Sequence, residues 1–192
     1  MDAYGNFFIQ KILEYLNFEM LLNFIEVIKN DLYYIATNPY GTRVIQKVLD
    51  LQIPEILKKM CTYIKFYILE FFMNANSIHI ISKIITDLAQ YSLFIYECIW
   101  NNMIKISVDK NGCYIIQKCF EKCLDMKKYM IVALQNYMLF MTDQYANYVM
   151  QFLISIGDQI FINELIVLIK PNIMTLAKQK FSANVLEKVK VI

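Results

Sequence analysis

Apolar and polar residues follow a helical period along most of this chain, and one twelve-residue pattern occurs six times. Each copy starts with turn-forming residues and continues with apolar side chains spaced to line one face of a helix. The copies are, in order, DAYGNFFIQKIL from residue 2, NPYGTRVIQKVL from residue 38, NANSIHIISKII from residue 74, DKNGCYIIQKCF from residue 109, DQYANYVMQFLI from residue 143 and QKFSANVLEKVK from residue 179. Recurrence of one helical segment is typical of a repeat protein.

The spacing of the copies is regular over the whole chain. Counted between their fifth residues, the steps are 36, 36, 35, 34 and 36 residues. Those fifth residues, called the anchors below, are Asn6, Thr42, Ile78, Cys113, Asn147 and Ala183. The segments between the copies also show a mostly helical pattern, so we expect a unit of helix, turn and helix. Units of this period stack into an α-solenoid, and the sequence therefore predicts an all-α fold.

Turn residues and apolar residues divide each copy into a start and a core face. The expected N-cap residues are Asp2, Asn38, Asn74, Asp109 and Asp143. Gly5, Gly41 and Gly112 lie in the same turns, and Pro54 and Pro171 fit helix starts or breaks. The predicted core stripe comprises Phe8, Ile9, Ile12 and Leu13 in the first copy, Val44, Ile45, Val48 and Leu49 in the second, Ile80, Ile81, Ile84 and Ile85 in the third, and Ile115, Ile116, Cys119 and Phe120 in the fourth.

The opposite face of the repeated helix carries a recurring polar set. Its last position holds Gln10, Gln46, Ser82, Gln117, Gln151 and Glu187. Its middle position holds Phe7, Arg43, His79, Tyr114, Tyr148 and Asn184. The residue after the last position is Lys11, Lys47, Lys83, Lys118 or Lys188 in five copies, and Phe152 in the other.

These residue types suit contact with single-stranded nucleic acid. A planar side chain can stack on a base, which contributes about 1–3 kcal/mol, and a glutamine amide can both donate to and accept from a base edge. A lysine one residue on can approach the phosphate backbone. A single glutamine or tyrosine on a helix is usually solvated or packed, but four glutamines at one repeat position favour a binding row. His79, beside Ile78 and Ser82, is its weakest member.

Composition narrows the alternatives without itself pointing to nucleic acid. Apolar residues make up 58% of the 192 residues, charged residues 19%, and the net charge is +2, which excludes a disordered, highly charged tail. The most apolar windows, 88–104 and 129–142, contain polar residues, so we interpret them as buried helices and expect no membrane association. No basic segment precedes an apolar stretch at the start, so no signal peptide is visible and we expect a cytoplasmic protein.

Little in the sequence supports catalysis or a cofactor. The five cysteines are irregularly spaced and there is one histidine, which argues against a zinc site. Cys119 and Cys123 are interpreted as small apolar core residues. There is no phosphate-binding glycine loop and no nucleophile elbow. We therefore expect no enzymatic activity, no metal site and no cofactor.

The repeated segments resemble those of the Pumilio, or PUF, family of RNA-binding proteins. The resemblance covers essentially the whole chain and is closest in NPYGTRVIQKVLD, DQYANYVMQFL and QKFSANVLEK. It implies a right-handed α-solenoid of three-helix units of about 35 residues, whose concave face binds one RNA base per repeat, antiparallel to the chain. It also implies one PUF domain over residues 1–192, incomplete because the first and eighth family repeats are not evident. Its approximate repeats are 1–17 (partial), 18–53, 54–89, 90–125, 126–158 and 159–192.

The resemblance assigns a role to each position of the polar set. The residues that would read a base edge are Asn6 with Gln10, Thr42 with Gln46, Cys113 with Gln117, Asn147 with Gln151, and Ala183 with Glu187. The residues that would stack are Phe7, Arg43, His79, Tyr114, Tyr148 and Asn184. In the family, Asn with Gln favours uracil, Cys or Thr with Gln favours adenine, and Ser with Glu favours guanine. Ala183 in place of Ser weakens the guanine assignment.

In the direction opposite to the chain, these sets predict the RNA element 5′-GUANAU-3′, the interior of the family's UGUANAUA. The third copy, with Ile78 and Ser82, falls on the base that the family tolerates. The resemblance further implies a monomeric regulator that binds single-stranded RNA in mRNA 3′ untranslated regions, with deadenylase or translational-repressor proteins as partners.

Two other functions fit part of this pattern. A ribosome-biogenesis relative would bind RNA without sequence preference, but such relatives usually lose intact base-reading sets. A protein-binding scaffold of armadillo or HEAT type would share the core stripe without needing a recurrent glutamine.

Overall fold

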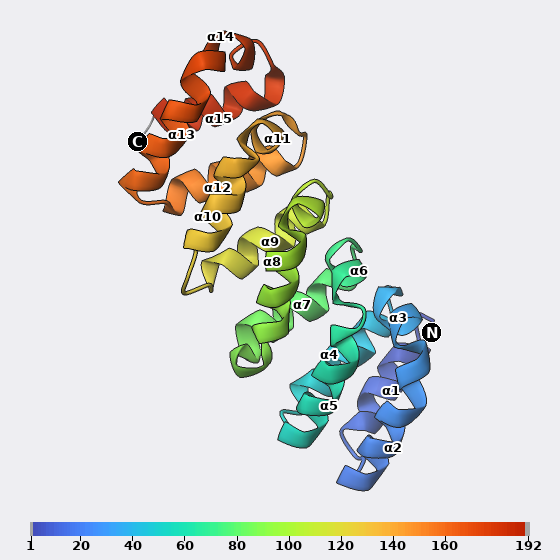
Figure 1. Ribbon diagram of the computed structural model, residues 1–192. Coiled ribbons are helices and arrows are strands. Elements are labelled where there is room, and N and C mark those ends of the chain that lie inside the picture. Colours follow the sequence, from blue (N-terminus) through green and yellow to red (C-terminus); the bar gives the residue numbers. More distant parts are fainter. Residues whose placement is uncertain (1, 191–192) are drawn as a thin grey trace. The chain divides into compact units, whose positions relative to one another are not determined.

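The structure, a computed structural model, describes residues 2–190 as helices joined by short turns (Figure 1). The helices are α1 (Gly5–Leu13), α2 (Phe18–Ile28), α3 (Leu32–Thr37), α4 (Gly41–Asp50), α5 (Pro54–Lys65), α6 (Ile68–Phe72), α7 (Ile78–Asp87), α8 (Leu93–Ser107), α9 (Gly112–Glu121), α10 (Lys127–Gln135), α11 (Tyr137–Thr142), α12 (Ala146–Ile156), α13 (Gln159–Ile169), α14 (Ile173–Leu176) and α15 (Lys180–Lys190). Short 3₁₀ segments are η1 (Lys29–Asp31), η2 (Ala89–Tyr91) and η3 (Lys170–Asn172). Residues 2–190 contain no strand, and the predicted all-α fold is confirmed. Residues 1 and 191–192 of the predicted domain lie outside the described residues.

The chain forms two compact units, one up to Cys98 and one from Ile99. In the first unit, α1 packs against α4 and α4 against α7, while α2 packs against α5. In the second unit, α9 packs against α12 and α12 against α15, while α10 packs against α13. Corresponding helices of successive repeats therefore lie side by side within each unit, as in a solenoid.

A full repeat contains three helices, one more than the residue pattern alone predicts. Within residues 18–53, η1 separates α2 from the short α3, and α4 follows as the third helix. Within residues 90–125, the corresponding break is a kink inside α8, where Asn102 has φ −134° and ψ 19°. The break between α2 and α3 could not be predicted from the residue pattern, because residues 28–32 contain neither proline nor glycine. The three-helix unit implied by the family resemblance is the one observed.

A side-chain acceptor fixes the turn before each of five third helices. Oδ1 of Asp2 accepts hydrogen bonds from the backbone N–H of Tyr4 (2.9 Å) and Gly5 (2.7 Å). The same arrangement recurs in four other turns, where a side-chain Oδ1 accepts hydrogen bonds from the backbone N–H groups two and three residues farther along the chain. The accepting residues are Asn38, Asn74, Asp109 and Asp143. These residues were expected to be N-caps, but they lie three or four residues before the helix and act through an Asx turn.

A small residue stands at or just before the start of the third helix in several repeats, because this position lies against the end of the second helix. A Cβ atom on Gly41 would lie 2.2 Å from the carbonyl oxygen of Ile35, and Gly112 has an equally close neighbour. At the corresponding position of the third repeat, the Ser77 hydroxyl donates to the carbonyl oxygen of Phe71 (3.1 Å). The close approach fixes the direction in which each third helix leaves the turn.

The predicted core stripe is buried in the second, third and fourth copies. The buried members are Val44, Ile45, Val48, Leu49, Ile80, Ile81, Ile84, Ile85, Ile115, Ile116, Cys119 and Phe120. In the first copy Leu13 is buried, but Phe8 and Ile12 are exposed. The prediction was wrong for these two residues, which lie at the surface of the first unit although α1 packs against α4.

One described segment, Gln159–Leu176, is apolar and long enough to cross a membrane by composition and length alone, with 18 residues and a mean hydropathy of 1.3. It is divided into α13, η3 and α14, and Pro171 lies in the 3₁₀ segment between the two helices. Helix α13 has 11 residues, about half of the roughly 20 that a spanning helix needs. Since α13 also packs against α10, we interpret the segment as part of the last repeat.

Candidate nucleic-acid interface

The six recurring sets lie on the third helices of the repeats. Helices α1, α4 and α7 carry three sets in the first unit, and α9, α12 and α15 carry three in the second. Within each unit these helices pack in sequence order. Each unit therefore presents a row of three sets.

The anchor and middle positions of a set differ in exposure. The buried anchors are Asn6, Thr42, Ile78, Cys113 and Asn147. The middle residues are exposed, with accessible fractions of 68% for Phe7, 52% for Tyr114 and 54% for Tyr148. Arg43, His79 and Asn184 are exposed as well. The planar groups are therefore available for stacking, whereas the anchors are held in place by their neighbours.

In the first and fifth copies, the anchor and the last residue form a hydrogen-bonded amide pair. Nε2 of Gln10 donates to Oδ1 of Asn6 (2.9 Å), and Nε2 of Gln151 donates to Oδ1 of Asn147 (3.0 Å). Nδ2 of each asparagine donates to backbone carbonyl oxygen of the preceding turn. These bonds fix the asparagine oxygen toward the glutamine, so both pairs have the same arrangement.

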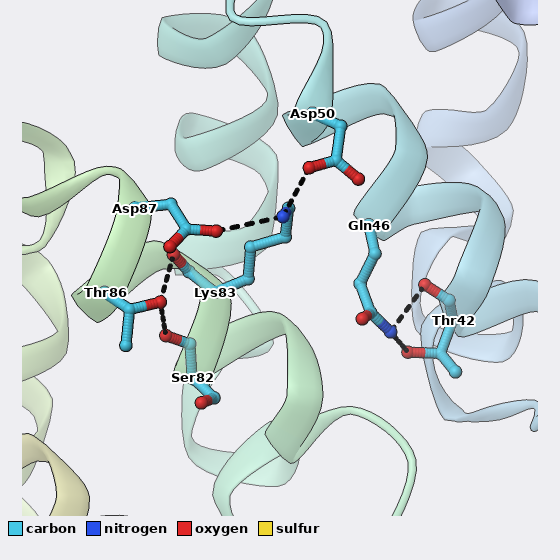
Figure 2. A network of polar contacts seen from close by, with 7 residues as sticks. All are labelled: Thr42, Gln46, Asp50, Ser82, Lys83, Thr86 and Asp87. Carbon is cyan, nitrogen blue, oxygen red and sulfur yellow. Dashed lines mark hydrogen bonds and ion pairs between the residues drawn. The ribbon is translucent and has the colours of Figure 1, made fainter.

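In the second and fourth copies, the glutamine donates to the backbone carbonyl oxygen of its anchor residue. Nε2 of Gln46 donates to the carbonyl oxygen (3.2 Å) and Oγ1 (3.3 Å) of Thr42 (Figure 2), and Nε2 of Gln117 donates to the carbonyl oxygen of Cys113 (2.6 Å). Oγ1 of Thr42 donates in turn to the carbonyl oxygen of Asn76 in the following repeat (3.1 Å). The amide oxygen Oε1 of each glutamine takes no part in these bonds. The family resemblance grouped these residues two by two as base-edge readers, but neither the hydrogen bonds within the groups nor this difference between them was predicted.

The third and sixth copies have no polar anchor. Ile78 is apolar and buried, and Ser82 on the next turn is half-buried. Ala183 offers no side-chain hydrogen bond, while Glu187 is exposed. A base at either copy would meet at most one polar side chain of the predicted pair.

Three lysines that were predicted to contact phosphate lie against carboxylates. Lys11 pairs with Glu14 just after its own helix and its side chain remains 65% exposed. Lys47 and Lys83 pair with acids of the preceding repeat and are more deeply buried. Nζ of Lys47 lies 2.7 Å from Oε1 of Glu14. Figure 2 shows Nζ of Lys83 between the carboxylates of Asp50 and Asp87. It lies 2.5 Å from Oδ1 of Asp50 and 3.0 Å from Oδ2 of Asp87, and the lysine side chain is only 15% exposed. These ammonium groups face acids of the protein.

The ion pairs shift the pKa values of the groups that form them. Hydrogen bonds from Lys11, 2.6 Å away, and from Lys47 lower the pKa of the Glu14 carboxyl from 4.5 to about 2. At Lys83 burial opposes the charged form most strongly, but hydrogen bonds with Asp50 and Asp87 outweigh burial and raise the pKa of the ammonium. The two acids therefore favour the charged form of Lys83 despite its burial.

The three remaining members of this series, Lys118, Phe152 and Lys188, form no ion pair with a carboxylate among the residues that the structure describes. Nζ of Lys118 lies 4.9 Å from the centre of the Tyr114 ring. Lys188 is half-buried on α15. Phe152, which interrupts the lysines, stacks against Phe120 with ring centres 6.4 Å apart and planes 29° apart.

The acidic partners are the residues that sequence reasoning missed. Glu14 and Asp50 lie three residues after Lys11 and Lys47, and this repeated spacing was the available signal. The spacing alone did not identify the contact, because each acid pairs with the lysine of the next copy, which lies 33 residues farther along the chain.

Comparison with known proteins finds the same repeat. The family model described as the Pumilio-family RNA binding repeat matches residues 1–28, 31–61, 102–133 and 136–168, together more than half of the chain. The suppressor protein MPT5 of Saccharomyces cerevisiae is 32% identical over 203 aligned residues, which cover 98% of this chain and 24% of that protein.

Solved structures share the fold over nearly the whole chain. The RNA-binding domain of yeast Puf5p bound to AAT2 RNA superposes with a TM-score of 0.84 at 29% identity, covering 98% of this chain and 56% of that one. The Puf4 RNA binding domain bound to the HO endonuclease RNA 3′ UTR recognition sequence gives 0.85 at 26% identity, covering 97% and 60%. The chain spans 24% to 38% of the length of the curated relatives that it matches.

Proposed function

The chain belongs to the Pumilio family of RNA-binding repeat proteins, and we propose that it binds single-stranded RNA with sequence preference through the third helices of its repeats. The observation that carries the proposal is the preformed reading pair in the first, second, fourth and fifth copies. Each pair is hydrogen-bonded and lies beside an exposed ring or guanidinium group. Such a pair needs little reordering before it meets a base.

The Asn–Gln pairs on α1 and α12 match uracil. The Watson–Crick edge of uracil has an N3–H donor between two carbonyl acceptors. The Asn147 oxygen has a second lone pair for N3–H, and Gln151 keeps one N–H for a carbonyl. The same reasoning applies to Asn6 and Gln10. We assign uracil to both copies.

The pairs on α4 and α9 match adenine. Adenine presents an amino donor, N6–H₂, at its edge. The Oε1 atoms of Gln46 and Gln117, which the observed bonds leave unused, can accept from this amino group. At α15, the Glu187 carboxylate can accept from the N–H donors of guanine, while Ala183 adds no bond and should leave this preference weaker.

In the antiparallel direction, the proposed bases of the second unit are G, U and A, and those of the first unit are N, A and U. The proposed element is therefore 5′-GUANAU-3′, within UGUANAUA. The unassigned base falls on α7, where the buried anchor Ile78 has no polar atom in its side chain. Exposed Phe7, Arg43, His79, Tyr114, Tyr148 and Asn184 are the proposed stacking residues, and Lys11, Lys118 and Lys188 the proposed phosphate contacts.

For the protein as a whole we propose regulation of mRNA through 3′ untranslated regions. The support is family analogy and the 3′ UTR recognition sequence bound to the neighbour Puf4. The proposal includes a monomer acting in the cytoplasm with deadenylase or translational-repressor partners. A reporter mRNA with UGUANAUA in its 3′ UTR should yield less protein when the chain is tethered or overexpressed. An unchanged yield would contradict the regulatory role alone.

The RNA-binding proposal is tested by the dissociation constant for a short RNA that contains UGUANAUA, compared with the same RNA carrying ACA in place of UGU. We expect binding that the exchange weakens by about 100-fold or more, since each mismatched position should cost about 1–3 kcal/mol, as measured for protein–DNA sites. Equal binding of both RNAs would indicate a binder without sequence preference. Absence of binding to both would overturn the proposal.

A further inference from the structure

We infer that, in three of the sets, the residue directly after the last position joins its repeat to the preceding repeat, and thereby positions neighbouring sets relative to one another. The residues concerned are Lys47, Lys83 and Phe152. Their role in RNA binding rests on the proposed function, but the contacts themselves do not.

The first two contacts have the same geometry in successive repeats. Lys47 follows Gln46 on α4 and contacts Glu14, which directly follows α1. Lys83 follows Ser82 on α7 and contacts Asp50 at the end of α4 (Figure 2). In both cases a lysine directly after the last position of a set extends to the end of the preceding third helix. The contact therefore sets the distance between two neighbouring sets.

The second unit uses an aromatic contact in the same direction. Phe152 follows Gln151 on α12, and its ring stacks against Phe120 near the end of α9. The chemistry changes from an ion pair to a ring pair, while the connection from one third helix back to the preceding one is kept. This explains why a phenylalanine can interrupt the lysine series.

The surroundings of Lys83 argue against a phosphate contact. Its ammonium lies between two carboxylates and most of the side chain is buried. A phosphate that approached would have to displace an acid or accept its repulsion. Lys118 is different, because it lies over the exposed Tyr114 ring, where a stacked base would bring its own phosphate nearby. The lysines that look equivalent in sequence therefore divide into two groups.

The spacing of the sets matters because the RNA is read at one base per repeat. If the contact between Asp50 and Lys83 is lost, α4 and α7 can shift relative to each other, and the spacing of the bases that they read becomes less strictly defined. Loss of a phosphate contact would instead weaken binding without changing the preferred spacing.

The test uses the whole chain with the variants Lys83→Gln, Asp50→Asn and their combination, and Lys118→Gln as the matched control. Urea unfolding without RNA measures the contact itself. We expect each single change at the pair to raise the unfolding equilibrium constant by up to about fivefold, and the combined change to add little, because both remove the same interaction. Additive effects, or none, would overturn the inference whether or not the chain binds RNA.

RNA binding is then measured with GUANAU and with GUANNAU, in which one nucleotide separates the bases assigned to α7 and α4. Lys83→Gln should reduce the discrimination between the two RNAs by up to about fivefold, and Lys83→Arg should restore it. The dependence of affinity on salt should stay unchanged. Lys118→Gln should keep the discrimination and flatten the salt dependence by about 0.7 in log–log slope. The reverse pattern, with Lys83→Gln flattening the slope and leaving discrimination intact, would establish Lys83 as a phosphate contact.

Discussion

At the scale of single residues, the orientation of one amide group distinguishes the two kinds of reading pair. Gln117 donates to the backbone of Cys113, whereas Gln151 donates to the side chain of Asn147. A glutamate at position 117 would have no N–H to donate and would present two acceptor oxygens, which suit the N–H donors of guanine.

We therefore expect Gln117→Glu combined with Cys113→Ser to shift the preferred base at this repeat from adenine to guanine. The preference for GUGNAU over GUANAU should become about tenfold or more, since one good bidentate pair contributes about 1–3 kcal/mol of discrimination in protein–DNA recognition. Competition binding with the two RNAs measures the shift. The matching change at α4, Gln46→Glu with Thr42→Ser, should act only on the other adenine. Retention of adenine at both repeats would contradict the assigned readers.

A second residue-scale prediction concerns the stacking ring of Tyr148. Its side chain is 54% exposed, so its removal should disturb packing little. We expect Tyr148→Ala to weaken RNA binding by about 1–3 kcal/mol, and Tyr148→Phe to preserve it because the ring is kept. Dissociation constants and the urea midpoint should be measured together. Equal RNA affinity of the alanine variant and the unaltered chain would exclude stacking at this position.

At the scale of the elements, the start of each third helix is fixed by how closely it approaches the preceding helix. Gly41→Ala would place a Cβ atom 2.2 Å from a backbone oxygen, so the helices must move apart. We expect a loss of about 1–3 kcal/mol in the free energy of unfolding, as for other overpacked sites. Gly5→Ala is the control, because its Cβ would meet only the flexible Asp2 side chain, at 2.9 Å. A similar loss in both variants, measured by urea unfolding, would argue against the proposed cause.

The elements also show where sequence reasoning succeeds and where it stops. The third helices were predictable because their apolar stripe recurs with the repeat, and Val44 and Ile80 are buried as expected. The break between α2 and α3 was not predictable, since no residue there is a strong helix breaker. The partner of Lys83 was also missed, because Asp50 becomes its neighbour only when two repeats pack together.

At the scale of the whole molecule, successive repeats pack against each other within each unit, so stability depends on the contacts between them. Ion pairs contribute to these contacts at more than one place. Besides the pair of Glu14 and Lys47, Glu26 on α2 contacts Lys59 and accepts from the Tyr63 hydroxyl (2.7 Å), both on α5. Such contacts require the carboxylates to be ionised.

The last prediction is therefore that acid weakens the repeat array. Hydrogen bonds from Lys29, Lys59 and Tyr63 lower the pKa of the Glu26 carboxyl from 4.5 to about 2, and that of Glu14 is lowered equally by its lysines. A carboxyl whose pKa is lowered by folding contributes stability that is fully present above its unfolded pKa and is lost as the pH falls through the folded one. The contribution of these two acids should thus be constant from pH 7 to about 5 and decline between 4.5 and 2. Urea midpoints across this range measure it, with Glu14→Gln and Glu26→Gln as the test variants. Their midpoints should lie below that of the unaltered chain at pH 7 and converge with it near pH 2, whereas a constant difference at every pH would show that ionisation of these acids does not hold the repeats together.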